Sequence, residues 1–329
     1  MTYPKISIVT PSYNQGQFLE ETIDSVLSQN YPDLEYFVVD GGSTDNSREI
    51  IEKYSKHLTW WVSEKDNGQS HAINKGLKRA TGDIFNWINS DDYYEPKALF
   101  TVAEKFMETD ASMISFRAKV FGLQTRVSRG TDLFDDNLAK TLAYTRIDQP
   151  ETFFSKAAFQ RMGLLNENLH YCMDKEWFLR YLLLHGQDKA INSDEVILNF
   201  RYHDASKSVL QQSKFEKESD AIYAEYASFL NRSREAEYLW SLAERAESRV
   251  LEISETPVLA ESGKAMIHYY LFKRFAEEYD KLNRKKAQKL SGLLDVNQLS
   301  FEDAWHYRKL DNRLTLPSFL IRFARLFTR

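Results

Sequence analysis

The stretch NWINSDDYYEP, residues 86–96, ends an apolar run in two adjacent carboxylates, Asp91 and Asp92. Neighbouring negative charges repel each other, so a cation is expected beside them or one carboxylate must turn away. The structural alternative is a helix start, in which Asp92 caps a helix that begins near Pro96. The stretch by itself does not decide between a cation site and a helix cap.

Strands and helices alternate along the chain up to this stretch. Short apolar runs rich in β-branched residues predict buried strands, and apolar residues at helical spacing predict the helices between them. Helices that connect successive strands in this way predict an α/β fold with a parallel, doubly wound sheet. We expect strands within 5–13, 34–40, 58–66 and 84–92, and helices within 15–28, around 50–54 and within 69–80.

Each predicted strand ends in polar residues. Ligands bind at the carboxyl ends of the strands in such sheets. We therefore expect four separate stretches to deliver polar side chains to one cleft, which favours a ligand-binding function for the two adjacent carboxylates. The residues at the strand ends are Thr10 and Tyr13, then Asp40, then Glu64 and Asp66, then Asp91 and Asp92.

Several common ligand motifs are absent from the sequence. No G-x-G-x-x-G follows the first predicted strand, and there is no G-x-x-x-x-G-K-[ST], no H-E-x-x-H and no pair of C-x-x-C motifs. These absences argue against dinucleotide, P-loop and zinc sites. Carboxylates without cysteine favour Mg²⁺ or Mn²⁺, which bind one or two protein carboxylates together with phosphate oxygens. The expected ligand therefore carries a phosphate or a diphosphate.

Four stretches, 7–47, 63–92, 149–182 and 200–208, together resemble the family 2 glycosyltransferases, inverting enzymes with the GT-A fold. The resemblance covers about two thirds of the chain, and the ordered combination is more specific than any single stretch. It implies transfer of a sugar from a nucleoside diphosphate sugar, by default a UDP-sugar, to a hydroxyl of a glycan or lipid-linked acceptor. It also implies a Mn²⁺ or Mg²⁺ cofactor and a place in cell-surface polysaccharide synthesis.

The resemblance implies roles for individual residues. Asp91 and Asp92 match the end of the family's D-x-D element, which holds the metal and the ribose. This chain has Asn89-Ser90-Asp91-Asp92 where the family often has D-S-D-D, so the metal ligand is assigned to Asp92, with Asp91 on the ribose or the metal. The nucleotide-binding residues by resemblance are Thr10, Pro11 and Tyr13 as the base wall, Asp40 at the base or ribose, and Asp66 as a second carboxylate that reads the base.

The stretch CMDKEWFLRY resembles the family's segment with the catalytic base and contains two carboxylates, Asp174 and Glu176. Residues two apart on a helix diverge by about 200°, so only one of them is expected to face the cleft. The resemblance favours Asp174 as the base. Trp177 fits either a core position or a sugar-stacking role, whereas Trp87 and Cys172 fit plain packing.

The stretch FRYHDASKS adds three further candidates. By resemblance, His203 lies near the metal or diphosphate, and Ser206 and Lys207 close over phosphate; a structural histidine is the alternative. Gln149 is a candidate to face the acceptor.

Composition limits the remaining classes. The chain of 329 residues has a net charge of −5, which does not suggest a nucleic-acid binder. Its single cysteine, Cys172, allows no internal disulfide and fits a reducing compartment. The first residues do not have the pattern of a signal peptide, and no apolar run approaches the roughly 18 residues of a membrane span. We expect a cytoplasmic protein.

The last third of the chain differs from the rest. Residues 209–279 have a composition typical of helices, so we expect a catalytic domain at 1–210 and a helical region at 211–329. Residues 281–329 carry a net charge of +7, against −12 for the remainder. The segment 316–329 alternates apolar residues and arginines at helical spacing, which predicts a helix lying on an anionic membrane or docked on protein. With this helix on a membrane, the protein is peripheral at the inner face of the cell membrane.

Two other functions stay open at this point. A scaffold that binds sugar nucleotides without catalysis would have the same fold, but the presence of both Asp92 and Asp174 argues against it. A nucleotidyltransferase also combines an α/β sheet with Mg²⁺. Such enzymes usually have a basic, glycine-rich first loop, and the loop TPSYNQGQF contains no lysine or arginine.

Overall fold

The computed structural model describes residues 2–134, 136–203, 210–243, 251–314 and 316. The chain divides into two compact units, one formed by 1–133 with 146–216 and the other by 134–145 with 217–329. The second unit thus includes a short segment from the middle of the chain. The domain boundary predicted at residue 210 stays a prediction, because compact packing does not establish independent folding.

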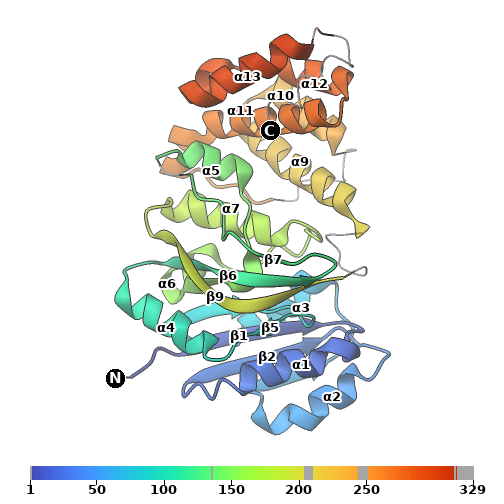
Figure 1. The fold of residues 1–329 in the computed structure, drawn as a ribbon, viewed down its shortest axis with the longest axis vertical. Coiled ribbons are helices and arrows are strands. Elements are labelled where there is room, and N and C mark those ends of the chain that lie inside the picture. The colour runs from blue at the N-terminus through green and yellow to red at the C-terminus, as the bar shows by residue number, and fades with distance from the viewer. Residues whose placement is uncertain (1, 135, 204–209, 244–250, 315, 317–329) are drawn as a thin grey trace. The chain divides into compact units, whose positions relative to one another are not determined.

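The first unit is built on one mixed sheet (Figure 1). Its order is β3-β2-β1-β4-β8-β6-β9-β5, and β7 pairs with β6. The first four strands in this order run parallel, β8 is antiparallel to both neighbours, and β6 and β9 are parallel. The strands are β1 (Ile6–Ser12), β2 (Leu34–Asp40), β3 (Trp60–Ser63), β4 (Ile84–Trp87), β5 (Tyr93–Tyr94), β6 (Met113–Gly122), β7 (Arg126–Val127), β8 (Thr152–Ser155) and β9 (Ala190–Tyr202).

Helices connect the parallel strands, as the sequence pattern predicts. Every residue of β1 is buried, which is typical of a parallel strand covered on both faces. Helix α1 buries Leu19, Ile23 and Val26, which follow one another at helical spacing. The helices are α1 (Gly16–Leu27), α2 (Ser47–Tyr54), α3 (Gln69–Leu77), α4 (Ala98–Glu108), α6 (Lys156–Met162) and α7 (Met173–His185), with 3-10 turns η1 (Ser55–His57) and η2 (Gln149–Glu151).

The turn after β4 does not start a helix at Asp92. The short strand β5 follows directly and pairs with β9. Helix α4 begins only at Ala98, after Lys97, whose φ of +66° ends the extended segment. The helix-cap alternative for Asp92 is therefore wrong, and the two carboxylates lie between two strands.

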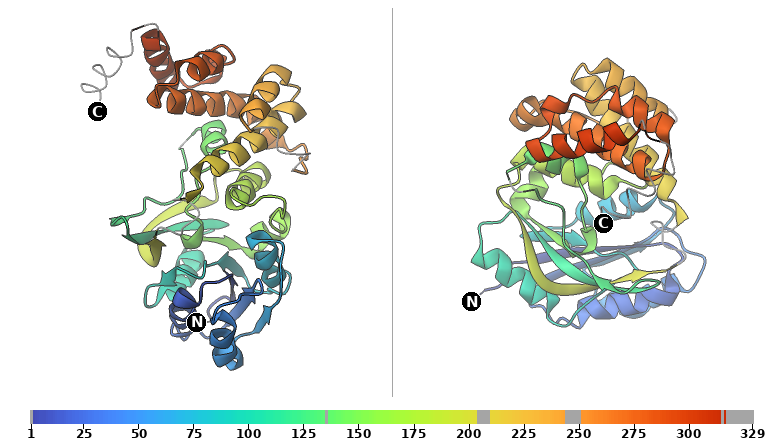
Figure 2. Two further views of the ribbon diagram at one scale, coloured as in Figure 1. Left: turned by 90° about the vertical axis from the view of Figure 1, so that its right-hand side faces the viewer. Right: turned by 45° about the horizontal axis from the view of Figure 1, so that its top comes forward.

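The described residues of the second unit form helices (Figure 2). Pro257 begins the long helix α11, and the Thr256 side chain caps it by accepting a hydrogen bond from the Leu259 backbone N–H at 3.1 Å. Helix α11 packs against α5, α12 and α13. The helices are α5 (Leu138–Tyr144), α9 (Gln212–Phe229), which begins in the first unit, α10 (Ser233–Leu242), α11 (Pro257–Asp280), α12 (Arg284–Ser291) and α13 (Phe301–Leu314), with the 3-10 turn η3 (Val296–Gln298).

Among the described residues, no helix has both the length and the apolar character to cross a membrane. The predicted interfacial helix at 316–329 lies outside the described residues, except for Leu316.

Candidate active site

A cleft of about 880 Å³ lies in the first unit, where the strand ends of the sheet meet. Its lining includes residues that follow β1, β2, β3 and β4, as the position of the polar strand ends predicts. The same cleft is lined by the start of α7 and by residues 147–151. Of the predicted site residues, Pro11, Tyr13, Asp66, Asp91, Gln149 and Asp174 line it.

Two predicted nucleotide-binding residues lie beneath the cleft and do not line it. Thr10 is fully buried, and its Oγ1 lies 2.9 Å from the hydroxyl of Tyr36. Asp40 is also fully buried, and its carboxylate accepts hydrogen bonds from the Ser43 backbone N–H at 2.9 Å and from the Ser63 hydroxyl at 2.7 Å. Both residues therefore hold the floor of the cleft in place.

Asp66 reaches the cleft from the loop after β3. Its Oδ1 accepts a hydrogen bond from the Gly68 backbone N–H at 2.8 Å. Its carboxylate packs on Gly41, where a Cβ atom would lie only 2.6 Å from Asp66 Oδ2. The absence of a side chain at Gly41 thus lets Asp66 approach the end of β2.

The adjacent carboxylates Asp91 and Asp92 point in different directions. Asp91 lines the cleft, and its Oδ2 lies 3.0 Å from Nε2 of His203. Asp92 is only 1% exposed, and its Oδ1 accepts a hydrogen bond from the Arg201 backbone N–H at 2.9 Å. Burial raises the pKa of Asp92 well above its ordinary value, and the nearby charge of Asp91 raises it further. The chain therefore separates the like charges by burying one of them.

The two carboxylates of the predicted base segment also separate. Asp174 lies in the first turn of α7 and lines the cleft. Glu176 is buried and accepts a hydrogen bond from Arg180 Nε at 3.1 Å. The same arginine donates to the carbonyl oxygens of Met162 and Leu164, each at 2.7 Å. Glu176 thus helps to attach α7 to the end of α6.

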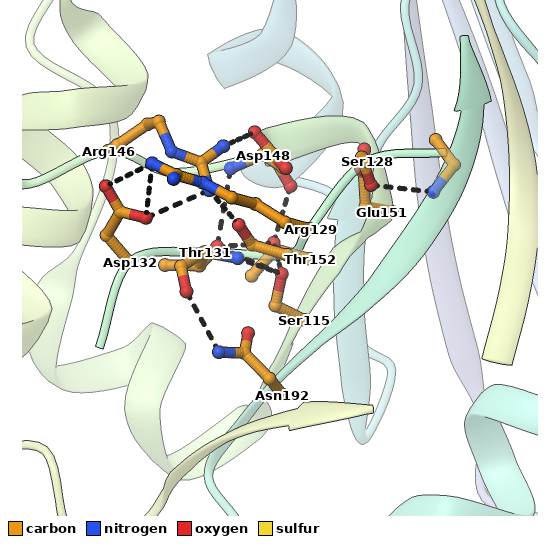
Figure 3. A network of polar contacts seen from close by, with 12 residues as sticks. Ser115, Ser128, Arg129, Thr131, Asp132, Arg146, Asp148, Glu151, Thr152 and Asn192 are labelled. Carbon is orange, nitrogen blue, oxygen red and sulfur yellow. Dashed lines mark hydrogen bonds and ion pairs between the residues drawn. The ribbon is translucent and has the colours of Figure 1, made fainter. Parts of the chain in front are cut away.

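Figure 3 shows a network of polar contacts that includes Ser128, Asp148 and Glu151, which line the cleft. The guanidinium of Arg146 lies between Asp132, 3.0 Å from Nη2, and Asp148, which lines the cleft. Beside them, the Ser128 hydroxyl donates a hydrogen bond to Glu151 at 2.8 Å. Burial raises the pKa of Glu151 to about 8, with the charge of Asp148 as the second cause.

The sequence contains no local pattern that predicts this network. Its members come from the loop after β7, the segment after α5 and η2, and no spacing motif links them. The only signal was Gln149, a candidate for the acceptor side. Its amide Nε2 donates to Asn86 Oδ1 at 2.9 Å and to the Trp87 carbonyl at 2.8 Å, so it also fastens η2 to β4.

The remaining candidates have packing roles or are not described. Trp87 and Trp177 are buried with ring centroids 5.3 Å apart, and only Trp87 reaches the cleft. Cys172 is buried. Ser206 and Lys207 lie outside the described residues.

The pair Asp91 and His203 fits a hard divalent cation. Within the described ranges, no group of three or more His, Cys, Asp or Glu side chains could hold a metal ion. A carboxylate oxygen such as that of Asp91 is a preferred ligand of Mn²⁺ and Mg²⁺, whereas the imidazole nitrogen of His203 is a less typical ligand for them. Mg²⁺ and Mn²⁺ sites that serve phosphate ligands use one or two protein groups, because phosphate oxygens and waters supply the others.

Comparison with known proteins gives consistent matches. The family described as glycosyl transferase family 2 matches residues 7–185. An uncharacterized glycosyltransferase of Rickettsia typhi is 24% identical over 250 residues, which are 70% of this chain and 73% of the relative. The Bacillus subtilis glycosyltransferase TuaG, whose name provisionally assigns it to teichuronic acid biosynthesis, is 37% identical over 110 residues, 32% of this chain and 43% of that protein.

Two solved structures share the fold over nearly the whole chain. Residues 1–349 of TarS from S. aureus give a TM-score of 0.55 at 19% identity, covering 99% of this chain and 92% of that one. The mannosyltransferase PcManGT from Pyrobaculum calidifontis, in complex with GDP-Man and Mn²⁺, gives a TM-score of 0.55 at 16% identity, covering 98% and 83%. At these identities the likeness concerns the fold.

Proposed function

Because the chain belongs to glycosyl transferase family 2, we propose that it transfers a sugar from a nucleoside diphosphate sugar to a hydroxyl of an acceptor. The GT-A-type α/β fold expected from the sequence is confirmed by the solved structures that share it. The observation that carries the proposal is the cleft, in which Asp66, Asp91 and Asp174 face one space of about 880 Å³.

The donor nucleoside is proposed to bind between Pro11, Tyr13 and Asp66, which line one end of the cleft. Asp66 accepts hydrogen bonds and can read the N–H groups of a base. Thr10 and Asp40 support this end from below. UDP is the default nucleoside diphosphate, and solved relatives in complex with UDP-GlcNAc and with GDP-Man make both UDP and GDP worth testing.

The cation ligands are proposed to be Asp91 and His203. The family resemblance implies Asp92 as the first metal ligand. The burial of Asp92 and its hydrogen bond from the Arg201 backbone favour Asp91 instead. A bound Mn²⁺ or Mg²⁺ supplies positive charge beside the diphosphate leaving group.

Asp174 is proposed as the general base of a single displacement that inverts the anomeric carbon. Its carboxylate accepts the proton of the acceptor hydroxyl while that oxygen attacks the anomeric carbon and the bond to the diphosphate breaks. The cleft holds both reactants, so the barrier contains less of the entropic cost of bringing them together. Glu176 is proposed to act only by holding α7.

The acceptor is proposed to be a glycan or a lipid-linked glycan, by resemblance to the family and to polysaccharide enzymes such as TuaG. Residues 281–329 carry a net charge of +7, which favours contact with an anionic membrane surface at the cytoplasmic face. In the described part of this region, α13 exposes Phe301 and Trp305 one helical turn apart. Sedimentation with phosphatidylcholine vesicles, with and without phosphatidylglycerol, tests the contact: binding only to the anionic vesicles is expected.

A ligand panel tests the proposed reaction. The full chain is mixed with UDP, dTDP, GDP, CMP or NAD, each with Mn²⁺ or with EDTA, and its unfolding temperature is measured. One nucleoside diphosphate is expected to stabilise the protein, with about 2.7 kcal/mol at 100 times its Kd. The matching sugar nucleotides are then tested for slow release of the nucleoside diphosphate.

Two variants make the panel specific. Asp91→Asn should lose the Mn²⁺-dependent part of the stabilisation, whereas Asp110→Asn, at an exposed position with a side chain 89% accessible, should keep it. Stabilisation by no nucleotide, or by NAD alone, contradicts the proposed function. Binding of a sugar nucleotide without any release of nucleoside diphosphate, with or without acceptors, indicates a scaffold.

A further inference from the structure

Arg201, in β9, contacts both members of the adjacent carboxylate pair. Its backbone N–H donates to Asp92 Oδ1 at 2.9 Å, and its side-chain Nε donates to the Asp91 carbonyl oxygen at 3.1 Å. Its Nη2 pairs with the carboxylate of Glu21 on α1. Arg201 is not among the residues that line the cleft, and neither is His203.

The guanidinium of Arg201 lies close to two aromatic rings. Its Cζ is 4.6 Å from the ring centroid of Phe18 on α1 and 4.7 Å from that of Phe121 on β6. A guanidinium stacks on rings and donates in fixed directions, which a lysine ammonium cannot reproduce. Phe18 also packs against the ring of His203, with centroids 5.2 Å apart. One side chain therefore connects α1, β6, β9 and the turn after β4.

Asp91 and His203 depend on this connection because they come from distant parts of the chain. They are 112 positions apart in sequence, yet Asp91 Oδ2 and His203 Nε2 lie 3.0 Å from each other. The backbone of Asp91 is fixed by Arg201 Nε, and His203 follows Arg201 by two residues on the same strand end. Residues that orient ligands from behind commonly change metal affinity by 10- to 100-fold when mutated.

We propose that Arg201 is a positioning residue that holds Asp91 and His203 in their cation-binding arrangement without touching the cation or the donor. The inference rests on the proposed function, because it assigns a role toward the cation that the function includes. A merely structural role for Arg201 would affect stability and every ligand alike. A positioning role affects the cation affinity and leaves the nucleoside end of the cleft unchanged.

The test compares Arg201→Met and Arg201→Lys with wild type in the full chain. The Kd for Mn²⁺ is measured from the electron paramagnetic resonance signal of free Mn²⁺, with UDP or the nucleoside diphosphate chosen by the panel. The Kd of the same nucleotide is measured in EDTA. Arg201→Met is expected to raise the Mn²⁺ Kd at least tenfold, Arg201→Lys less, and both should change the metal-free nucleotide Kd less than twofold.

Arg117→Met is the matched control. Arg117 also lies on the β6–β9 pair, but its Nη2 pairs at 2.5 Å with Asp194, whose side chain is 90% exposed, and it does not line the cleft. The Mn²⁺ Kd of Arg117→Met should equal that of wild type. Circular dichroism establishes that each variant is folded, and Arg201→Lys provides the test if Arg201→Met does not fold.

The outcomes separate the inference from the proposed function. An unchanged Mn²⁺ Kd in both Arg201 variants overturns the positioning role, as does a parallel loss of metal-free nucleotide binding. A wild type that binds nucleotide but no Mn²⁺ overturns the cation site and this inference with it. A wild type that binds no nucleotide at all contradicts the proposed function itself.

Discussion

Asp220 in the second unit and Asp91 in the first unit have opposite surroundings. In the second unit, Asp220 is 1% exposed, accepts a hydrogen bond from Tyr270 at 2.7 Å and pairs with Arg274 at 3.1 Å. In the first unit, Asp91 keeps 21% of its side chain exposed and faces the cleft. A buried charge with protein partners supports the packing around it, whereas a carboxylate that keeps accessible oxygen can bind a ligand.

The same contrast exists between neighbours within the first unit. Asp91 and Asp174 face the cleft, and Asp92 and Glu176 are buried with partners of their own. For Asp91 and Asp92, residue type and motif position do not distinguish the carboxylate that faces the cleft from the buried one. Four variants test this difference between buried and cleft-facing carboxylates.

The largest effect is expected for Asp174→Asn. A positioned general base contributes about 10²- to 10⁴-fold to a rate, so turnover should fall by about 10³-fold while donor affinity stays unchanged. Turnover is measured as release of nucleoside diphosphate with an acceptor present, and donor affinity by thermal shift. Glu176→Gln is the matched comparison. It should lower the unfolding temperature and leave turnover close to the wild-type rate. If Glu176→Gln removes turnover and leaves stability unchanged, Glu176 is the base.

Arg274→Met should have the largest effect on stability. Removing one partner of a buried ion pair leaves Asp220 without its countercharge and typically costs about 3–5 kcal/mol. Urea unfolding measures the change, and the affinity for nucleotide in the first unit should stay at the wild-type value. Arg308→Met, at an exposed position of α13, should change the free energy of unfolding by less than about 0.5 kcal/mol. A fully stable Arg274→Met protein would contradict the structural role of the pair.

Asp92→Asn tests which of the two adjacent carboxylates binds the cation. Burial raises the pKa of Asp92, so a neutral amide of the same size is a mild replacement there. We expect the Mn²⁺-dependent thermal shift to persist, with a free energy of unfolding within about 1 kcal/mol of wild type. If Asp92→Asn loses the Mn²⁺-dependent thermal shift and Asp91→Asn keeps it, Asp92 is the metal ligand.

The effect of Glu151→Gln is expected as a change in the pH dependence of stability. Burial raises the pKa of Glu151 to about 8 in the folded protein, whereas an unfolded glutamate titrates near about 4.3. Between these values the unfolded state binds fewer protons, so the contribution of Glu151 to stability is complete below about pH 4 and is lost as pH rises to about 8.

Glu151→Gln should therefore weaken the fall in stability between about pH 5 and pH 8. One proton changes the slope by up to about 1.4 kcal/mol per pH unit, and urea unfolding at several pH values measures it. Glu108→Gln, at an exposed position, should keep the wild-type slope. Equal slopes in Glu151→Gln and wild type would contradict the raised pKa.

Much of the first unit could be predicted from local sequence patterns. The expected strand at 5–13 is β1 at Ile6–Ser12, and the expected helix at 69–80 is α3 at Gln69–Leu77. Such patterns are readable because a buried strand or an amphipathic helix requires apolar residues at a fixed period. The polar residues at the strand ends also placed the cleft, because parallel strands point their carboxyl ends in one direction.

The network of polar contacts in Figure 3 and the role of Arg201 could not be predicted in this way. Arg146 meets Asp132 across 14 positions, and Arg201 meets Asp91 across 110. No local sequence periodicity indicates such contacts. They arise from the register between distant strands, such as β5 with β9, where Tyr93 is paired with Asn199.

The sequence by itself determined which segments become strands and helices and which edge of the sheet collects the polar residues. The tertiary structure placed Asp91 rather than Asp92 at the cleft, and Asp174 rather than Glu176, the second as the family resemblance favours. Asp92 is buried because β9 brings the backbone N–H of Arg201 to its carboxylate, and Glu176 is buried because Arg180 and the end of α6 lie beside it. Burying a carboxylate costs free energy unless hydrogen bonds compensate it. Distant segments therefore supply the hydrogen-bond partners that allow one carboxylate of each pair to be buried, and the other carboxylate faces the cleft.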